Sequence, residues 1–309
     1  MKAAQFSEYG GPSAIQVTDI DKPSVGDGQV LVEVHASSIN PFDSKIMSGA
    51  MKDNIPLDLP VTLGGDIAGV VVEPGDSEFS EGGRVYGQAN AVAGNSGAFA
   101  EFATTKASQI AVAPNDFSFN EIASLPLVGV SALQALTVHL DLQADQKLFI
   151  HGGAGGIGSM AIQIAKNIGA YVAVTATGDD MAYVSELGAD EIIDYKEKDF
   201  SEELSNFDAV FDMVGGDETD KSFKILKSGG KVVSMVAEPD EAKAKEAGIT
   251  AFHQFTKVTT EMLNKLRELV ESGIVNPQVD QVFDLENISE AFEAKESGRS
   301  KGKIVIKIK

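Results

Sequence analysis

The chain has 309 residues, of which 43% are hydrophobic and 23% are charged, enough for two globular domains with sizeable cores. Its net charge of −21 argues against nucleic acid as a partner, because phosphate binding needs a basic surface. It has no cysteine, which excludes disulfides and any zinc site built on thiolates.

The first residues, Met1 to Phe6, predict a strand and not the apolar segment of a signal peptide. No run reaches the roughly 18 apolar residues that a membrane-spanning helix needs. A basic amphipathic segment for a membrane surface is also missing. We therefore expect a cytoplasmic protein with no membrane partner.

The first part of the chain, to about residue 120, predicts short strands. Residues 30–34 and 67–72 are β-branched runs, and glycine-rich turns recur between such runs. Short strands with frequent turns indicate a compact barrel or sandwich.

From residue 121 the pattern changes. A mixed helical stretch at 121–140 leads into alternating strands and helices, with strands expected at 148–151, 171–175, 191–194, 209–211 and 231–236. Apolar runs that alternate with helices are typical of a parallel sheet covered on both faces.

The last part of the chain predicts a helix at 258–272, where apolar residues repeat with a helical period before Gly273. Residues 303–308 alternate as a strand does. This strand suits the β-rich first part, so we expect the C-terminus to complete that domain.

The strongest motif follows the strand that ends at His151 and precedes an amphipathic helix. Glycines in that place allow a tight turn and bring the backbone close to a pyrophosphate, which the helix N-terminus then binds. The motif G-x-G-x-x-G consists of Gly153, Ala154, Gly155, Gly156, Ile157 and Gly158.

The sequence indicates less directly which dinucleotide is bound. About 20 residues after the motif, where an acidic residue grips the ribose of NAD, the chain has the neutral Thr177. This favours NADPH, although Asp179 and Asp180 follow at once and leave NADH open. Tyr195 and Lys196 are candidates to stack on the adenine and to offset the acidic charge.

These features, together with motifs along the whole chain, resemble the medium-chain dehydrogenase/reductase family, in its zinc-independent quinone oxidoreductase-like (zeta-crystallin-like) branch. The motifs lie at residues 40–45, 64–71, 83–87, 125–132, 187–190, 212–216 and 302–305. The resemblance implies an α/β protein in which a Rossmann domain, a doubly wound parallel sheet, is inserted into a GroES-like β-barrel domain. The expected domains are 1–121 with 260–309, and 122–259. It also implies a homodimer joined through the edges of the Rossmann sheets.

The zinc-containing members of this family bind the metal through cysteine and histidine. The equivalent stretches here, 40–43 and 64–66, contain neither residue. Of the four histidines, His35, His139 and His151 are expected to be structural, and His253 is the fourth. We therefore predict no metal.

Without zinc, the acceptor must already be electrophilic, as a quinone or an α,β-unsaturated carbonyl compound is. The resemblance implies that Asn40, Asp43 and Lys45 lie beside the nicotinamide, with Tyr86 and Ser131 nearby. Our hypothesis is that Asn40 and Lys45 polarise the acceptor oxygen, that Asp43 orients Lys45, and that Tyr86 or solvent provides the proton.

The resemblance also implies the cofactor contacts. Those expected at the phosphates and ribose are Ser131 and the turn 153–158. Those expected at the adenosine end are Thr175, Thr177 and Tyr195. Those expected at the nicotinamide half are Asn40, Val214, Gly215, Met235 and Val236.

The sequence thus predicts an NADPH-dependent enzyme that transfers hydride to a quinone or a similar small electrophile. Two alternatives stay open, a reductase of the C=C bond of 2-alkenals or enones and a protein that binds NAD(P)H without catalysis. Residues 46–62 and 88–97 are expected to form the walls of the acceptor pocket.

Overall fold

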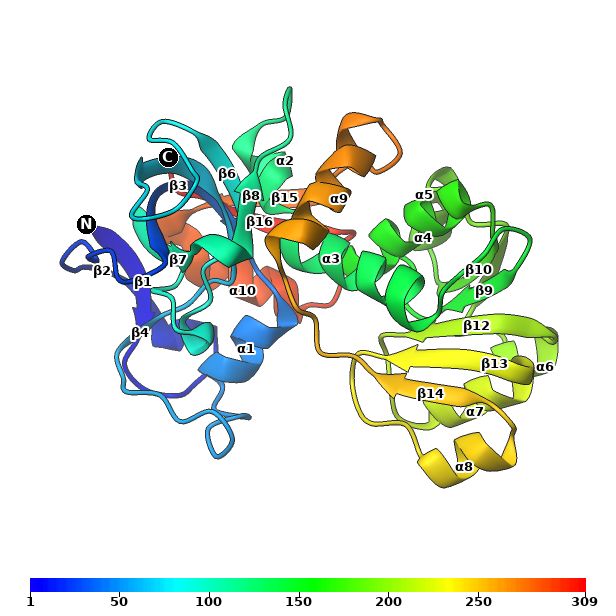
Figure 1. The fold of residues 1–309 in the computed structure, drawn as a ribbon. Coiled ribbons are helices and arrows are strands. Elements are labelled where there is room, and N and C mark those ends of the chain that lie inside the picture. The colour runs from blue at the N-terminus through cyan, green and yellow to red at the C-terminus, as the bar shows by residue number, and fades with distance from the viewer. The chain divides into compact units, whose positions relative to one another are not determined.

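A computed structural model describes residues 1–309, and the chain divides into two units (Figure 1). The first, here called the β unit, consists of Met1–Leu127, Val258–Glu271 and Pro277–Lys309. The second, here called the Rossmann unit, consists of Val128–Lys257 and Ser272–Asn276.

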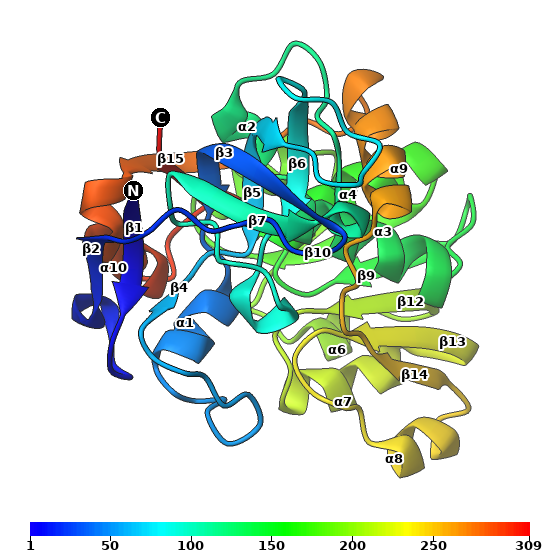
Figure 2. The ribbon, with the colours of Figure 1, turned by 60° about the vertical axis from the view of Figure 1, so that its left-hand side comes forward.

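The β unit contains two sheets. A three-stranded sheet has the order β2-β1-β4, and a seven-stranded sheet has the order β15-β16-β3-β5-β6-β8, with β7 also paired to β3. The strands are β1 (Lys2–Phe6), β2 (Ile15–Asp19), β3 (Gln29–Ser38), β4 (Val61–Thr62), β5 (Asp66–Glu73), β6 (Arg84–Gln88), β7 (Phe102–Lys106), β8 (Ile110–Val112), β15 (Val279–Asp284) and β16 (Lys303–Lys307). Because β16 pairs antiparallel with β3, the C-terminal strand completes the N-terminal sheet as the sequence predicts. Figure 2 shows the late elements β15 and α10 (Ile288–Glu296), in orange, next to the blue N-terminal strands of this unit.

Helices interrupt this unit. They are α1 (Pro41–Met47), α2 (Phe119–Ala123), α9 (Thr260–Glu271) and α10 (Ile288–Glu296), with 3₁₀ turns at Pro12–Ala14, Ala91–Ala93, Ala107–Gln109 and Leu285–Asn287. The expectation of strands up to about residue 120 is wrong at α1, whereas α2 lies at the start of the expected helical stretch. Both α1 and α2 begin with a capping box, formed by Asn40 and Asp43 in α1 and by Ser118 and Glu121 in α2. These caps stabilise helices that are too short to show a period in the sequence.

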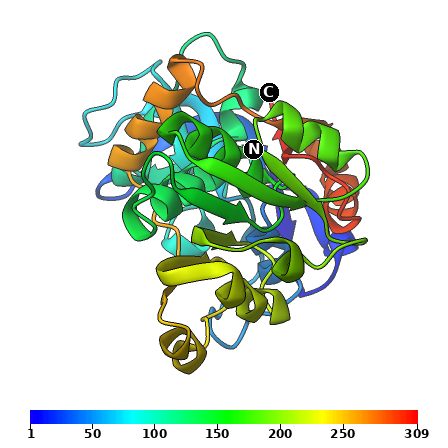
Figure 3. The same cartoon turned by 90° about the vertical axis from the view of Figure 1, so that its right-hand side faces the viewer.

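The Rossmann unit is built on one six-stranded parallel sheet of order β11-β10-β9-β12-β13-β14, whose strands run from green to yellow in Figure 3. The strands are β9 (Lys147–Ile150), β10 (Tyr171–Ala176), β11 (Glu191–Asp194), β12 (Phe207–Asp212), β13 (Leu226–Ser234) and β14 (Thr250–His253). The chain order reverses between β9 and β12. Ligands of such sheets bind at this switch point, beyond the carboxyl ends of the strands.

Helices cover both faces of this sheet, since right-handed crossovers place α4 and α5 on one face and α7 and α8 on the other. The helices are α3 (Pro126–Gln134), the π-helical turn η4 (Ala135–His139), α4 (Gly156–Ile168), α5 (Asp180–Glu186), α6 (Phe200–Glu203), α7 (Asp217–Ile225) and α8 (Glu241–Glu246). Phe149, Val210 and Val232, on neighbouring strands, lie at the centre of the core on one face.

The boundary between the units lies after Leu127, whereas the sequence placed it after residue 121. Residue 121 lies inside α2, which packs on β3 and β5 and so belongs to the β unit. The chain rejoins the β unit at Val258, close to the expected residue 260. None of the helices is long and apolar enough to cross a membrane.

Candidate functional site

The turn between β9 and α4 requires glycine at three of its positions, Gly152, Gly153 and Gly158. Gly152 has a φ of +77°. A Cβ atom at Gly153 would lie 2.9 Å from Cβ of Val174, and one at Gly158 would lie 2.3 Å from the carbonyl oxygen of Gly152. These contacts leave no space for side chains at Gly153 and Gly158, so the turn holds α4 tightly against the sheet.

The N-terminus of α4 fits a pyrophosphate. Gly155 is its N-cap and offers no side-chain oxygen, so no side chain caps the first turn. The first N–H groups of a helix have no partner within the helix, and they carry the positive end of the helix dipole. Backbone donors over an uncrowded glycine turn are the arrangement that binds a dinucleotide.

Thr175, near the end of β10, braces this turn. The backbone N–H of Gly152 donates to its hydroxyl oxygen at 2.9 Å, and the N–H of Gly153 donates to its carbonyl oxygen at 3.1 Å. The structure thus places the predicted residue Thr175 beside the predicted turn. It also adds Gly152, which precedes the G-x-G-x-x-G motif and which the motif alone does not identify.

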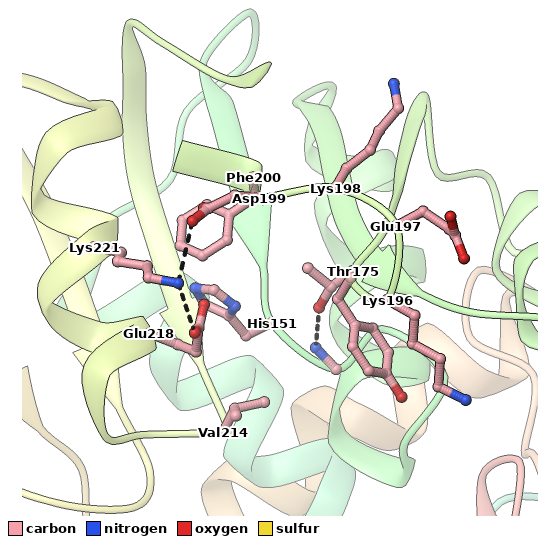
Figure 4. Close-up of a pocket in the computed structure, with 12 residues that line it drawn as sticks. His151, Thr175, Lys196, Glu197, Lys198, Asp199, Phe200, Val214, Glu218 and Lys221 are labelled. Carbon is pink, nitrogen blue, oxygen red and sulfur yellow. Dashed lines mark hydrogen bonds and ion pairs between the residues drawn. The ribbon is translucent and has the colours of Figure 1, made fainter. Parts of the chain in front are cut away.

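A cavity of about 640 Å³ adjoins the turn at the carboxyl ends of β9 to β12 (Figure 4). It is lined by His151, Gly152, Thr175, Tyr195, Lys196, Glu197, Lys198, Asp199, Phe200, Val214, Glu218 and Lys221. Three predicted cofactor contacts, Thr175, Tyr195 and Val214, come together here from three different strand ends. Tyr195 is 58% exposed and offers its ring to a ligand.

The three lysines that line this cavity differ in whether they form an ion pair. Lys221 lies 3.2 Å from Asp199 and 3.1 Å from Glu218, and its hydrogen bonds to them raise its pKa (Figure 4). Lys198 is also ion-paired. The side chain of Lys196 forms no ion pair, so it is the cavity lysine available to a ligand anion.

Thr177, Asp179 and Asp180 do not line this cavity. Asp179 and Asp180 begin α5, where acidic residues are favourable at a helix N-terminus. The two carboxylates therefore have a local role in the helix.

His151 lines the cavity, is buried and packs against the rings of Phe149 and Phe200, whose centroids lie 4.6 and 4.7 Å away. Its Nε2 lies 2.8 Å from the hydroxyl oxygen of Ser222, which itself donates to a backbone carbonyl. Burial lowers the pKa of His151, although Asp212 opposes this shift. The imidazole is therefore neutral and packs as a structural residue.

The residues expected at the nicotinamide half surround the end of β12. The N–H groups of Val214 and Gly215 donate to the carboxylate of Asp212 at 2.9 and 3.0 Å, and the N–H of Met235 donates to the Asp212 carbonyl at 2.9 Å. A Cβ at Gly215 would lie 2.9 Å from Val236. The structure thus brings Val214, Gly215, Met235 and Val236 together around Asp212, whose buried carboxylate the sequence alone does not single out.

Ser131, by contrast, lies apart from the cavity lining. It is fully buried, its hydroxyl oxygen is 2.7 Å from that of Thr256, and its carbonyl accepts from Nε2 of Gln254 at 3.0 Å.

In the β unit, Asn40 belongs to a buried polar cluster. Its Nδ2 donates to the carboxylate of Asp66 at 2.8 Å, and its Oδ1 accepts from Nζ of Lys303 at 2.5 Å. Nζ of Lys303 lies 3.5 Å from the same Asp66 oxygen, and all three side chains are at least 96% buried. A buried ion pair that holds both ends of an amide fixes the orientation of that amide. The sequence did not indicate Asp66 or Lys303 as functional residues.

Asp43 lies in the first turn of α1 and accepts the backbone N–H of Asn40 at 2.8 Å. Burial raises the pKa of Asp43 to about 7, although hydrogen bonds from the Asn40 and Gly64 backbone and the nearby Lys303 oppose the shift. This carboxyl group therefore carries a proton in a large fraction of molecules at neutral pH.

The other two predicted catalytic residues have different surroundings. Lys45 is exposed on α1, and no hydrogen bond or ion pair joins it to the buried Asp43 that was expected to orient it. Tyr86 is fully buried, its hydroxyl donates to the carbonyl of Leu263 at 2.6 Å, and burial raises its pKa. The role of Lys45 in polarising the acceptor and the role of Tyr86 as a proton donor stay predictions. The surroundings of Tyr86 are those of a packing residue.

The donor set of the chain does not fit a zinc ion. No group of three or more His, Cys, Asp or Glu side chains is arranged to hold a metal. The stretch where zinc-containing members carry ligands is here Gly64, Gly65 and Asp66, and Asp66 is engaged by Lys303.

Residues 26–115 match the family described as alcohol dehydrogenase GroES-like domain, and residues 187–306 match the family described as zinc-binding dehydrogenase. Over 320 aligned residues the chain is 33% identical to the chloroplastic NADPH-dependent alkenal/one oxidoreductase of Arabidopsis thaliana, covering 99% of this chain and 79% of that protein. The chain belongs to the medium-chain dehydrogenase/reductase family. Within it, the protein is of the zinc-independent, quinone oxidoreductase-like branch.

Solved structures of this branch have the same fold. The quinone oxidoreductase of Coxiella burnetii superimposes with a TM-score of 0.90 at 33% identity, covering 100% of this chain and 99% of that one. The Escherichia coli quinone oxidoreductase, solved with NADPH, gives a TM-score of 0.90 at 26% identity and covers all of both chains. The predicted fold class, a Rossmann domain combined with a GroES-like domain, is confirmed.

Proposed function

We propose that this protein is an NADPH-dependent oxidoreductase that reduces a quinone or an enone without a metal ion. The observation that carries the proposal is the turn at residues 152–158, which requires glycine at Gly152, Gly153 and Gly158, next to a cavity that holds an unpaired lysine. The names of two relatives, an NADPH-dependent alkenal/one oxidoreductase and a quinone oxidoreductase solved with NADPH, support the same activity.

Residues of the Rossmann unit would hold the cofactor. The N-terminal amides of α4 would bind the pyrophosphate, Tyr195 would lie against the adenine, and Lys196 would bind the 2′-phosphate that distinguishes NADPH from NADH. When bound, the nicotinamide supplies the hydride. Neither Ser131 nor Thr177 lines the cavity, so their contacts with the cofactor stay predictions from the sequence.

For the acceptor we keep Asn40 and Asp43 as candidate residues. The amide of Asn40 is held in one orientation by Lys303 and Asp66, which suits a group that must meet a substrate in a fixed geometry. Solvent is the simpler proton source, because the hydroxyl of Tyr86 is already donated to Leu263.

We also propose a homodimer that pairs through β14, the edge strand of the six-stranded sheet. An open sheet edge is prone to pair with another chain. The side chains of Val138 and Phe255, in segments next to this edge, are 62% and 75% exposed, and contact with a second subunit would bury them.

One experiment separates the candidate functions. The purified protein is assayed with NADPH and with NADH against benzoquinones, naphthoquinones, 2-alkenals and simple ketones, while cofactor binding is measured by fluorescence. We expect NADPH turnover with a quinone or an alkenal and none with a simple ketone. The acceptor with the higher kcat/KM decides between the quinone and the C=C reductase. Tight NADPH binding with no turnover on any acceptor would instead favour a non-catalytic binding protein.

A further inference from the structure

The backbone at Gly65, between β4 and β5, faces a small space bordered by side-chain amides. A Cβ atom at Gly65 would lie 3.7 Å from Nδ2 of Asn90, 3.7 Å from Nε2 of Gln88 and 4.0 Å from Nδ2 of Asn40. These three nitrogens are the nearest heavy atoms to that position. Each is a hydrogen-bond donor, so the space over Gly65 is suited to an acceptor atom.

Two of the amides are held with their nitrogens toward this space. Oδ1 of Asn90 accepts the backbone N–H of Val92 at 3.0 Å, which leaves its Nδ2 on the other side of the amide. Oδ1 of Asn40 accepts from the ammonium group of Lys303, which fixes that amide in the same way. Since these oxygens are committed to donors, neither amide can be reversed without losing a hydrogen bond.

The donors at Gln88 and Asn90 are not used within the chain. Nδ2 of Asn40 already donates to Asp66, whereas Nε2 of Gln88 and Nδ2 of Asn90 make no hydrogen bond to another residue. Both side chains are partly exposed, whereas Gly65 is buried. Donors that converge on one partly buried position are the arrangement that stabilises a developing oxyanion.

We infer that the space over Gly65 holds the carbonyl oxygen of the electron acceptor, and that Gln88 and Asn90 are catalytic residues which donate to it. This inference rests on the proposed function and adds to it the part of the substrate that is recognised. It also assigns a task to the segment 88–97, which the sequence identified only as a pocket wall.

The chemistry balances without a further reactant. Bound NADPH would supply the hydride, which forms a new bond to the conjugated acceptor, with NADP⁺ as the oxidised product. The displaced π-electron pair moves to the carbonyl oxygen, which becomes an enolate or a phenolate oxygen. The N–H groups of Gln88 and Asn90 stabilise that negative charge more than the neutral ground state, and a proton from solvent completes the reduction.

Gly65→Ala tests the space itself. The φ of Gly65 is not positive, and a methyl group there meets no atom closer than 3.7 Å, so the folded chain accepts it. The methyl group would nevertheless project into the space assigned to the acceptor oxygen and keep that oxygen away from the two amide donors. We expect kcat/KM for the best quinone or enone to fall by about tenfold or more, with NADPH binding and Tm unchanged. Gly11→Ala, where no atom lies within 4 Å, is the matched control.

Asn90→Asp tests the donor. It keeps the oxygen that accepts from Val92 but replaces the amide nitrogen by a carboxylate oxygen, which cannot donate when ionised. We expect a loss of kcat that is partly recovered as the pH falls and the carboxyl group gains a proton. Asn287→Asp, an exposed residue of the β unit with the same change of charge, should leave the pH profile as in wild type.

The outcomes are separable. If wild type reduces quinones or enones while Gly65→Ala and Asn90→Asp retain full kcat and an unchanged pH profile, the inference is overturned and the proposed function stands. If wild type binds NADPH but reduces no acceptor, the proposed function itself fails. Should Gly65→Ala not fold, Gln88→Leu replaces it, and full activity of that variant overturns the role of Gln88.

Discussion

In the proposed function, Lys196 is the residue that selects NADPH over NADH. It lines the cavity beside Tyr195 without an ion pair, whereas Lys221 is held by Asp199 and Glu218. We expect Lys196→Ala to weaken NADPH binding by about tenfold, equivalent to about 1.4 kcal/mol, because one phosphate–ammonium pair is lost. Titration calorimetry with NADPH and NADH measures this difference.

NADH lacks the 2′-phosphate, so its affinity should hardly change in that variant. Lys198→Ala is the control, because Lys198 lines the same cavity but is paired with Glu203. An equal loss of affinity for NADPH and NADH would show that Lys196 does not bind the 2′-phosphate.

Asp43 should make the stability depend on pH. Its pKa in the folded chain is about 7, above the ordinary value near 3.9, so the folded state binds more protons between these values. The contribution of Asp43 to the stability of the fold is therefore greatest below about pH 4 and is lost as the pH rises through 7. The charged groups that act on Asp43 are Lys303, which lowers its pKa, and Asp66, which raises it.

Asp43→Asn imitates the protonated acid and should remove this dependence. We expect the difference in Tm between the variant and wild type to shift in favour of the variant from about pH 5 to pH 8, as followed by circular dichroism. A constant difference across that range would mean that Asp43 is ionised throughout.

The position of a site residue could be predicted from the sequence where that residue lies at the end of a predicted strand. Thr175, Tyr195 and Val214 each follow or end a strand of the parallel sheet, and such ends meet at one edge. Lys303 could not be predicted in this way. It lies in a C-terminal strand whose pairing with β3 alone brings it to Asn40, and no local pattern shows that pairing.

At the scale of the element, the link between β9 and α4 depends on Gly158. A methyl group there would meet the carbonyl oxygen of Gly152 at 2.3 Å, so the turn or the helix must shift. We expect Gly158→Ala to lose most NADPH affinity and to lower Tm, since α4 also packs on β9 and β10. Fluorescence titration and thermal unfolding measure both effects.

The comparison variant is again Gly11→Ala, which should behave as wild type. Unchanged NADPH affinity in Gly158→Ala would mean that the dinucleotide does not bind at this turn.

Strands with apolar runs were predictable, and those without them were not. The sequence predicts five strands for the Rossmann sheet, but β14 (Thr250–His253) adds a sixth that is short and partly polar. The fifth was expected at 231–236, whereas β13 starts at Leu226. Its first half contains Gly229 and Gly230, which predict a turn, and the register shifts there through an irregularity.

At the scale of the whole molecule, the proposed homodimer gives a test of β14. Phe255→Asp places a charge on a strongly exposed ring next to this edge strand. We expect light scattering to show a dimer for wild type and a monomer for the variant, because a buried carboxylate is costly at an interface. Val282→Asp, an exposed apolar residue on β15 in the β unit, should remain dimeric.

A monomeric wild type, or a Phe255→Asp variant that stays dimeric, would contradict this assignment of the interface.

The overall architecture could be predicted from the sequence because the hydrophobic pattern of the first part of the chain differs from that of the middle part. Alternating strands with turns and continuous apolar strands with helices predict different kinds of sheet. The exact place where one unit gives way to the other was not accessible. It depends on α2, whose contacts with β3 and β5 assign residues 119–123 to the β unit.

The central claim is that the chain passes hydride from NADPH to a conjugated carbonyl compound with no metal ion. The most direct test is the rate of NADPH oxidation with the best acceptor before and after dialysis against a strong chelator, with the metal content measured on the same sample. We predict the same rate at negligible metal content, since the donor set offers no zinc site. Loss of activity on dialysis, restored by stoichiometric zinc, would contradict the account.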